Sequence, residues 1–290
     1  KLQSENVPQY LADIGNQVKS GWASAASNAE LPLTVSGIAP MPHFEIEHQL
    51  KMLVEAGHTV LVGFDFAYSY PRGTAEKLGL KEPLWREIWS LLSCKVQDNP
   101  NNKNNRFQVA ADLNHKLSGG PFPFWNCPPS QASEFLTTKK SKSHADVDIP
   151  EFRNAEEHGP GAQPVWKLFT AGSVGSQTIL GIPVLNALRF DDGLKEISQV
   201  WPFETGLEKL KPPKNNEWMI MHAEIFPSIF KIQEIPGQIK DLTQIETVAR
   251  KFAFWDEKGT LGSIFAGPTG LSKEQRKAIE TEEGWILGLT

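Results

Sequence analysis

The sequence predicts a single α/β domain built on a mixed sheet, and two observations carry this prediction. Strand candidates at about 9–14, 18–26 and 31–36 follow one another, with Gly, Asn and Pro in the turns between them. A segment of near-helical apolar spacing then occupies about 43–57 and leads directly into an apolar strand candidate at 59–65. The opening order of elements is therefore β-β-β-α-β.

The middle of the chain predicts helices and irregular structure. Residues 83–97 place large apolar side chains on one helical face, and a second helix is predicted at 106–117. Between 118 and 163 the composition shifts to Gly, Pro, Ser, Lys and Glu, which favours an irregular segment. We therefore expect one domain over 1–290, with a helical and irregular insertion at about 71–216 that folds over the sheet edge.

Regular structure is predicted again after the irregular segment. An apolar strand candidate at 165–169 precedes a turn of small residues at 170–176 and a helix to about Leu188. A clear strand candidate follows at 218–225. The chain is then expected to end in helices at about 239–256, 258–265 and 272–288.

The composition of the chain indicates which partners and which cellular compartment to expect. The 290 residues carry a net charge of -5, and their Lys and Arg residues are scattered, so binding to extended duplex nucleic acid is not expected. Cys94 and Cys127 are the two cysteines, which indicates a reducing, cytoplasmic compartment. The sequence shows neither a secretory leader pattern nor an apolar run long enough to span a membrane, so no membrane association is expected.

Acidic residues stand at the ends of the best strand candidates. Asp13, Asp65 and Glu224 each follow or end an apolar run, and Glu282 and Glu283 lie in the last predicted helix. Two-metal phosphoryl transfer needs several carboxylates that converge on one point, because hard divalent ions prefer oxygen ligands. A single acid at a strand end more often caps a helix or faces solvent, whereas the set as a whole favours Mg²⁺ or Mn²⁺ binding.

Several short motifs are spread over most of the chain. They are Asp13-x-Gly15, Ser20-Gly21-Trp22, Gly63-Phe64-Asp65-Phe66, Asn104-Asn105-Arg106-Phe107, Phe124-Trp125-x-Cys127-Pro128, Gly172-Ser173-Val174-Gly175-Ser176, Trp201-Pro202-Phe203-Glu204-Thr205, Ala223-Glu224-Ile225-Phe226-Pro227 and Glu282-Glu283-Gly284-Trp285-Ile286-Leu287-Gly288. These motifs resemble those of an uncharacterised "domain of unknown function" family with a predicted ribonuclease-H-like fold, whose opening order is also β-β-β-α-β. A bacterial branch of this family carries cobalamin- or molybdopterin-related labels.

The resemblance implies a ribonuclease-H-like fold, in which the last helix usually supplies an aspartate where this chain has Glu282 and Glu283. The function favoured by the sequence is a metal-dependent phosphoesterase or nuclease that acts on a small or single-stranded phosphodiester. Its catalytic and metal-binding residues would be Asp13, Asp65, Glu224 and Glu283, with Mg²⁺ or Mn²⁺ as the cofactor.

The Gly- and Ser-rich turn has two functional interpretations beside a plain packed turn. Backbone N–H groups at a helix N-terminus suit a phosphate or carboxylate, and Ser173 and Ser176 would then contact the anion. The turn also resembles a serine-hydrolase elbow without its first glycine, with Ser173 as nucleophile, His222 as base and Asp191 or Asp192 as acid.

Asn105 and Arg106 offer an amide and a guanidinium group at the start of a predicted helix. They would hold a phosphate or carboxylate, while the alternative is that Asn105 caps the helix. Together with the turn at 172–176 they define the first alternative function, an enzyme that acts on a small anionic metabolite. The second alternative is a binding or regulatory protein that retains the acids of the fold without catalysis.

Overall fold

The protein contains a four-stranded sheet covered by helices on both faces. The structure is a computed structural model that describes residues 22–26, 43–99, 103–170, 172–214, 217–232 and 240–290. The strands lie in the order β1-β2-β4-β3. Their bounds are β1 Trp22–Ala26, β2 Val60–Phe64, β3 Ser198–Val200 and β4 Ile220–Glu224. Strands β2, β4 and β3 are mutually parallel and β1 pairs antiparallel with β2, which confirms a mixed α/β class.

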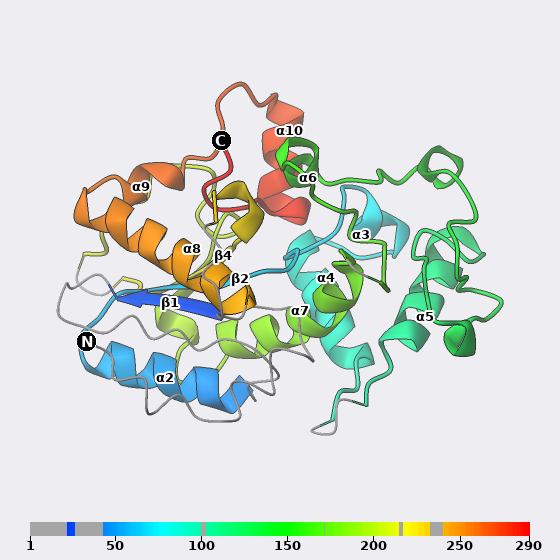
Figure 1. The fold of residues 1–290 in the computed structure, drawn as a ribbon, viewed down its shortest axis with the longest axis horizontal. Coiled ribbons are helices and arrows are strands. Elements are labelled where there is room, and N and C mark those ends of the chain that lie inside the picture. The colour runs from blue at the N-terminus through cyan, green and yellow to red at the C-terminus, as the bar shows by residue number, and fades with distance from the viewer. Residues whose placement is uncertain (1–21, 27–42, 100–102, 171, 215–216, 233–239) are drawn as a thin grey trace.

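The helices divide between the faces of the sheet and its flank (Figure 1). Their bounds are α2 His43–Glu55, α3 Thr74–Lys77, α4 Leu84–Lys95, α5 Arg106–Ser118, α6 Asn154–His158, α7 Gly175–Arg189, α8 Lys240–Glu257, α9 Leu261–Ile264 and α10 Lys273–Ala278. A single π-helical turn, Ile279–Glu283, continues α10 and leads into the C-terminal tail. None of the helices in these described ranges is both long and apolar enough to cross a membrane.

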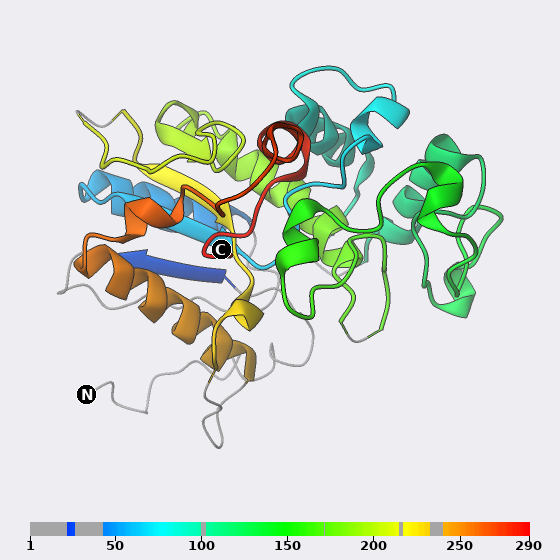
Figure 2. The same cartoon turned by 90° about the horizontal axis from the view of Figure 1, so that it is seen from above.

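Alternation along β2 explains the layers. Val60, Val62 and Phe64 enter a core that also contains side chains of α2 and α7, whereas Leu61 packs on the opposite core with side chains of α8. Side chains of a strand alternate between the two faces of the sheet, so β2 contributes side chains to both cores. Figure 2 shows the result, with α2 and α7 on one side of the sheet and α8 on the other.

The predicted helix at 43–57 and strand at 59–65 are confirmed as α2 and β2. The strand predicted at 18–26 overlaps β1, while the candidates at 9–14 and 31–36 lie outside the described residues. The finer assignment of a ribonuclease-H-like sheet therefore stays a prediction. Two elements within 71–216, α7 and β3, contact each other at the sheet, so that range includes part of the sheet and its covering layer.

The strand predicted at 165–169 is wrong. The segment is irregular and makes one isolated bridge, between Trp125 and Lys167. Val165, Trp166 and Leu168 are all buried, and the rings of Tyr70, Phe124 and His144 pack around Trp166. The apolar run that predicted a strand therefore reflects burial without a sheet.

The segment predicted to be irregular, 118–163, is so apart from short helical turns and α6. Hydrogen bonds from side chains to the backbone help to hold this segment in place. The amide of Asn114 on α5 donates to the carbonyl of Phe124 at 2.8 Å, and its oxygen accepts from the backbone N–H of Phe124 at 2.7 Å. Lys139, Lys140 and Lys142 of this segment are exposed.

A buried histidine in this segment predicts a pH dependence. His144 packs between Phe122 and Trp166, and neither ring nitrogen has a hydrogen-bond partner among the described residues. Burial lowers its pKa to about 4. A folded pKa below the unfolded value of about 6.5 gives stability that is present above pH 6.5 and is lost as the pH falls toward 4.

His144→Phe should remove this dependence, because phenylalanine fills the site without an ionisable group. Between pH 7 and pH 5 we expect the variant to lose about 1–2 kcal/mol less unfolding free energy than the wild type, as measured by urea denaturation. The exposed His48→Gln serves as the control and should follow the wild type. Equal losses of unfolding free energy in wild type and His144→Phe would show that protonation of His144 does not cause the pH dependence.

Candidate functional site

A cleft lies where β2 and β4 end. Asp65 directly follows β2, Glu224 is the last residue of β4, and Phe64 and Glu224 are partners in the parallel register. Carboxyl ends of parallel strands meet at one edge of a sheet, which is where α/β proteins place ligands. Asp65 and Glu224 line one cavity of about 390 Å³, together with residues of the turn at 172–174 and Gln244 of α8.

A buried arginine from the irregular segment binds Glu224. The Nη1 and Nη2 groups of Arg153 donate to Oε2 and Oε1 of Glu224 at 2.8 and 2.6 Å. Its Nε donates to Oε1 of Glu156 at 2.8 Å, its Nη2 also donates to Glu156, and its Nη1 donates to the carbonyl of Glu283 at 2.8 Å. Arg153 is 0% exposed, and all five N–H donors of the guanidinium have acceptors. Burial by itself lowers the pKa of Arg153, but Glu156 and Glu224 raise it above its ordinary value.

Acidic side chains are the charged groups in the described lining of the cleft. Glu156 and Glu224 share one guanidinium, and Asp65 adds a third carboxylate to the lining. Burial raises the pKa of Glu156, Arg153 opposes that rise, and neighbouring Glu224 adds to it. Oε2 of Glu224 accepts from Arg153 and from the backbone N–H of Tyr68 at 3.0 Å, whereas Oε1 accepts one bond. The charged residues in the described lining of the cleft are therefore all carboxylic acids.

Glu283 lies outside the cleft lining and anchors the backbone. Its Oε1 accepts from the N–H of Arg72 at 2.8 Å, and its Oε2 accepts from the N–H and side-chain amide of Asn154 at 2.9 and 2.7 Å. Glu282 accepts from the N–H groups of Gly73 and Ala75 at 2.9 and 2.7 Å, at the N-terminus of α3. The acids of the last predicted helix thus join the C-terminal turn to the segment that follows β2, and Glu283 does not join Asp65 and Glu224. Asp13 lies outside the described residues.

Ser173 lines the cleft, but its partners differ from those of a hydrolase nucleophile. Its hydroxyl donates to the carbonyl of Phe169. His222 is buried in β4 and its Nε2 is 2.8 Å from Oγ of Ser198, while burial, with a smaller contribution from Arg189, lowers its pKa to about 3. The described residues therefore do not assemble the Ser173–His222 pair that a serine hydrolase needs.

The proposed anion clamp is also not assembled at the cleft. Arg106 donates from Nε to Oγ of Ser176 at 3.1 Å and from Nη1 to Oδ1 of Asn104 at 2.6 Å. Asn105 binds the end of α4, where it donates to the carbonyl of Lys95 at 2.9 Å and makes no side-chain cap on α5. Arg106, Asn105 and Ser176 are absent from the described lining of the cleft, so the alternative of an anion held there loses its cationic group.

The turn at 172–176 is rich in small residues for a packing reason. A Cβ on Gly175 would lie 2.4 Å from the carbonyl oxygen of Val165 and 2.8 Å from that of Lys167. Glycine is therefore required at this position, because the first turn of α7 packs directly on the backbone of 165–167.

Arg153 and Glu156 are the site residues that sequence reasoning missed. They lie in a polar segment, where charged residues are usually solvated. The one signal is their spacing at the start of α6, where Oε2 of Glu156 accepts from the N–H of Arg153 at 2.8 Å, as in a capping box.

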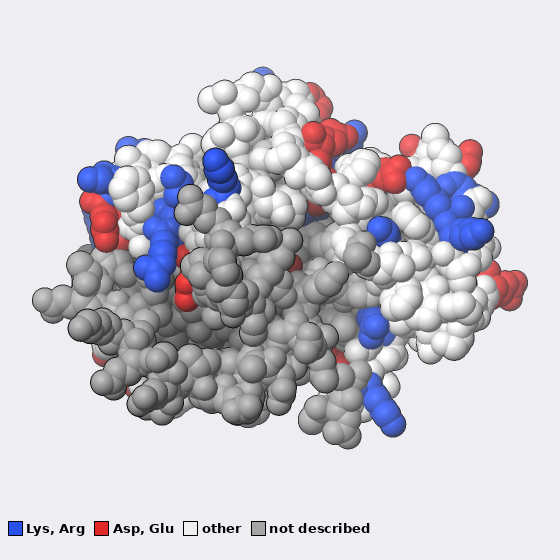
Figure 3. Space-filling view, viewed as in Figure 1, with Lys and Arg blue, Asp and Glu red and all other residues white. Residues whose placement is uncertain are grey.

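The surface charge agrees with the sequence analysis. Figure 3 shows basic and acidic side chains interspersed over the described part of one face. Within the described ranges no group of three or more His, Cys, Asp or Glu residues is arranged to hold a metal ion. A site for an ion in this cleft would therefore rest on two carboxylates and water, or include a ligand from outside these ranges.

Comparison of the chain with profiles of known protein families, with curated protein sequences and with solved structures finds no match.

Proposed function

We propose that the cleft at the carboxyl ends of β2 and β4 is the active site of a metal-dependent phosphoesterase or nuclease with a ribonuclease-H-like fold. One observation carries the proposal. Asp65 and Glu224 end neighbouring parallel strands and line one cavity together with Glu156, while the buried guanidinium of Arg153 binds Glu156 and Glu224 from outside that lining. A cavity of about 390 Å³ suits a small or single-stranded phosphodiester, and the interspersed surface charge gives no support for a bound duplex.

The donor set fits one hydrated Mg²⁺ or Mn²⁺ ion. Mg²⁺ is usually held by one or two carboxylates, retains several waters and takes further ligands from a substrate phosphate. Asp65 and Glu224 supply carboxylate oxygens of this kind, and Asp13 would be a third ligand. A two-metal centre that uses Glu283 does not fit, because both oxygens of Glu283 accept hydrogen bonds outside the cleft lining. When bound, such an ion polarises a phosphoryl oxygen and makes a bound water more acidic.

The chain's own groups orient the ligands. Arg153 fixes the carboxylate of Glu224 with two charge-assisted hydrogen bonds, so this group is preorganised before a substrate arrives. Gln163 and Gln244 also line the cleft, and their amides can form neutral hydrogen bonds with the ester groups of a substrate.

A second candidate is a non-catalytic protein that binds a cation or a ligand bearing an ammonium group at the same carboxylates. The observation that favours it is the lining itself, which has no Lys, Arg or His among its described residues. Only the first candidate function involves catalytic turnover, whereas both require Asp65 for binding.

Asp65→Asn tests the catalytic role. With about 1 mM Mn²⁺ and bis(p-nitrophenyl) phosphate as substrate, we expect the variant to lose at least about two orders of magnitude in kcat/KM, because the amide is a weak ligand for a hard cation. Ser173→Ala should retain most of the activity. Asp112→Asn on α5 makes the same chemical change at a partly exposed position outside the cleft lining and is the matched control.

The outcomes separate the three functions. Activity that survives a chelator and disappears in Ser173→Ala would contradict the metal-dependent mechanism and favour a serine hydrolase. If the wild-type protein binds Mn²⁺ through Asp65 but hydrolyses no phosphoester, the catalytic function is contradicted and the non-catalytic binding function is supported.

A further inference from the structure

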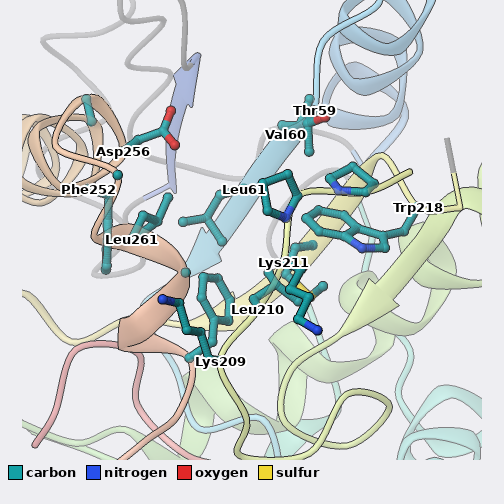
Figure 4. Close-up of a pocket in the computed structure, with 17 residues that line it drawn as sticks. Thr59, Val60, Leu61, Lys209, Leu210, Lys211, Trp218, Phe252, Asp256 and Leu261 are labelled. Carbon is teal, nitrogen blue, oxygen red and sulfur yellow. The ribbon is translucent and has the colours of Figure 1, made fainter. Parts of the chain in front are cut away.

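A second cavity lies at the opposite ends of the same strands. It has a volume of about 460 Å³ and is lined by Thr59, Val60 and Leu61 at the start of β2 and by Met221 of β4. Helices α8 and α9 and the segment 209–213 form its other walls (Figure 4). The two cavities share no lining residue, so this one is independent of the proposed active site.

The wall formed by 209–213 is fixed to α9. The N–H of Leu210 donates to the carbonyl of Gly262 at 2.9 Å. A Cβ on Gly262 would lie 2.3 Å from the carbonyl oxygen of Leu210, so the two backbones are in direct contact. This contact holds Lys209 and Lys211, on either side of Leu210, at the cavity.

The lining combines an apolar interior with a cationic side. Its large apolar side chains are Leu61, Leu210, Trp218, Phe252, Leu261 and Phe265. Lys209 and Lys211 are exposed, and Figure 4 shows them on the side of Leu210, whereas Asp256, the single acid of the described lining, lies across the cavity on α8. An apolar cavity with a few charged groups to one side is typical of sites for amphipathic ligands.

We propose that this cavity binds a small amphipathic anion, with its apolar body between Trp218 and Phe252 and its oxyanion headgroup beside Lys209 and Lys211. The apolar lining supplies most of the affinity, because it removes the hydrocarbon of the ligand from water. The two lysines supply the preference for a negative headgroup over a neutral or positive one. A carboxylate, a sulfonate and a phosphate monoester on a short hydrocarbon share this chemistry.

Displacement of the fluorescent probe 8-anilinonaphthalene-1-sulfonate tests the site, because the probe is itself an amphipathic anion with an aromatic body and a sulfonate group. We expect decanoate to displace it at concentrations about tenfold lower than 1-decanol, which has the same chain and no charge. Decyltrimethylammonium should be the weakest of the three competitors.

Two variants assign the binding to this cavity. Lys209→Gln/Lys211→Gln should abolish the preference for decanoate and leave the displacement by 1-decanol unchanged, while Lys273→Gln/Lys277→Gln on α10 is the control of equal charge change. Ala253→Phe, at a half-buried lining position of α8, should fill the cavity and weaken both ligands about tenfold.

The proposal is overturned if 1-decanol competes as well as decanoate against the wild type, or if the double glutamine variant keeps the preference. It is equally overturned if Ala253→Phe, with an unchanged far-ultraviolet circular dichroism spectrum, binds the probe as the wild type does.

Discussion

Arg153→Met is expected to lower the free energy of unfolding by about 3–5 kcal/mol, the usual cost of leaving buried charges unpaired. The variant keeps an unbranched apolar stem and removes the guanidinium, so Glu156 and Glu224 are left as neighbouring buried carboxylates. Urea denaturation at pH 7 measures the loss. Arg189→Met is the control: Arg189 is also buried, but its partner Glu204 is partly exposed and keeps contact with water, so this variant should cost less than Arg153→Met.

Acid should partly rescue this variant. The pKa of Glu156 is already raised by burial, and loss of Arg153 raises it further, since Arg153 opposes that rise in the wild type. A raised carboxyl pKa gives stability that is present at low pH and is lost as the pH rises through the folded pKa. The difference between Arg153→Met and wild type should therefore shrink from pH 7 to pH 5.

A triple variant isolates the charge effect from packing. Addition of Glu156→Gln and Glu224→Gln to Arg153→Met removes the unpaired charges and should recover part of the lost stability. Two results would show that the ion pairs of Arg153 with Glu156 and Glu224 do not stabilise the fold. One is a loss of unfolding free energy in Arg153→Met that is no larger than the loss in Arg189→Met. The other is a loss in Arg153→Met that is the same at pH 5 as at pH 7.

Gly175→Ala is expected to destabilise the protein by about 2–4 kcal/mol, although alanine is the better helix former. The added methyl group would overlap the carbonyl oxygens of Val165 and Lys167, which are backbone atoms that cannot rotate away. Gly120→Ala is the matched control, because the nearest atoms to its Cβ are 3.9 and 4.0 Å away. Thermal unfolding of the two variants measures the difference, and a Gly175→Ala midpoint equal to that of Gly120→Ala would contradict the close contact.

Elements with strong apolar periodicity could be predicted from the sequence. The helix predicted at 83–97 is α4, Leu84–Lys95, because Trp85, Ile88, Trp89 and Leu92 form its buried face. The three-residue strand β3 could not be predicted, since it is too short to show a pattern. The α-helix predicted at 272–288 is shorter in the structure, where α10 ends at Ala278. Beyond it, Glu282 and Glu283 accept hydrogen bonds from backbone N–H groups of the segment after β2, contacts that the sequence does not show.

The candidate site could be predicted where it depends on strand ends. Asp65 and Glu224 were placed at the ends of apolar runs, and the parallel pairing of β2 with β4 brings them to one edge. The partner of Glu224 could not be predicted, because Arg153 is 71 residues away in a polar segment and is buried only through tertiary contacts. The same holds for Glu283, whose hydrogen-bond donors at Arg72 and Asn154 lie far from it in sequence.

The central claim, that Asp65 and Glu224 hold a divalent cation in the cleft, is tested most directly by the melting temperature with and without Mn²⁺. For wild type at about 1 mM Mn²⁺ we predict a rise of about 2–5 °C, because a ligand that binds the folded state stabilises it. Asp65→Asn should show no rise, because an amide is a weak ligand for a hard cation. A wild-type midpoint that Mn²⁺ leaves unchanged, or an equal rise in both proteins, would contradict the account.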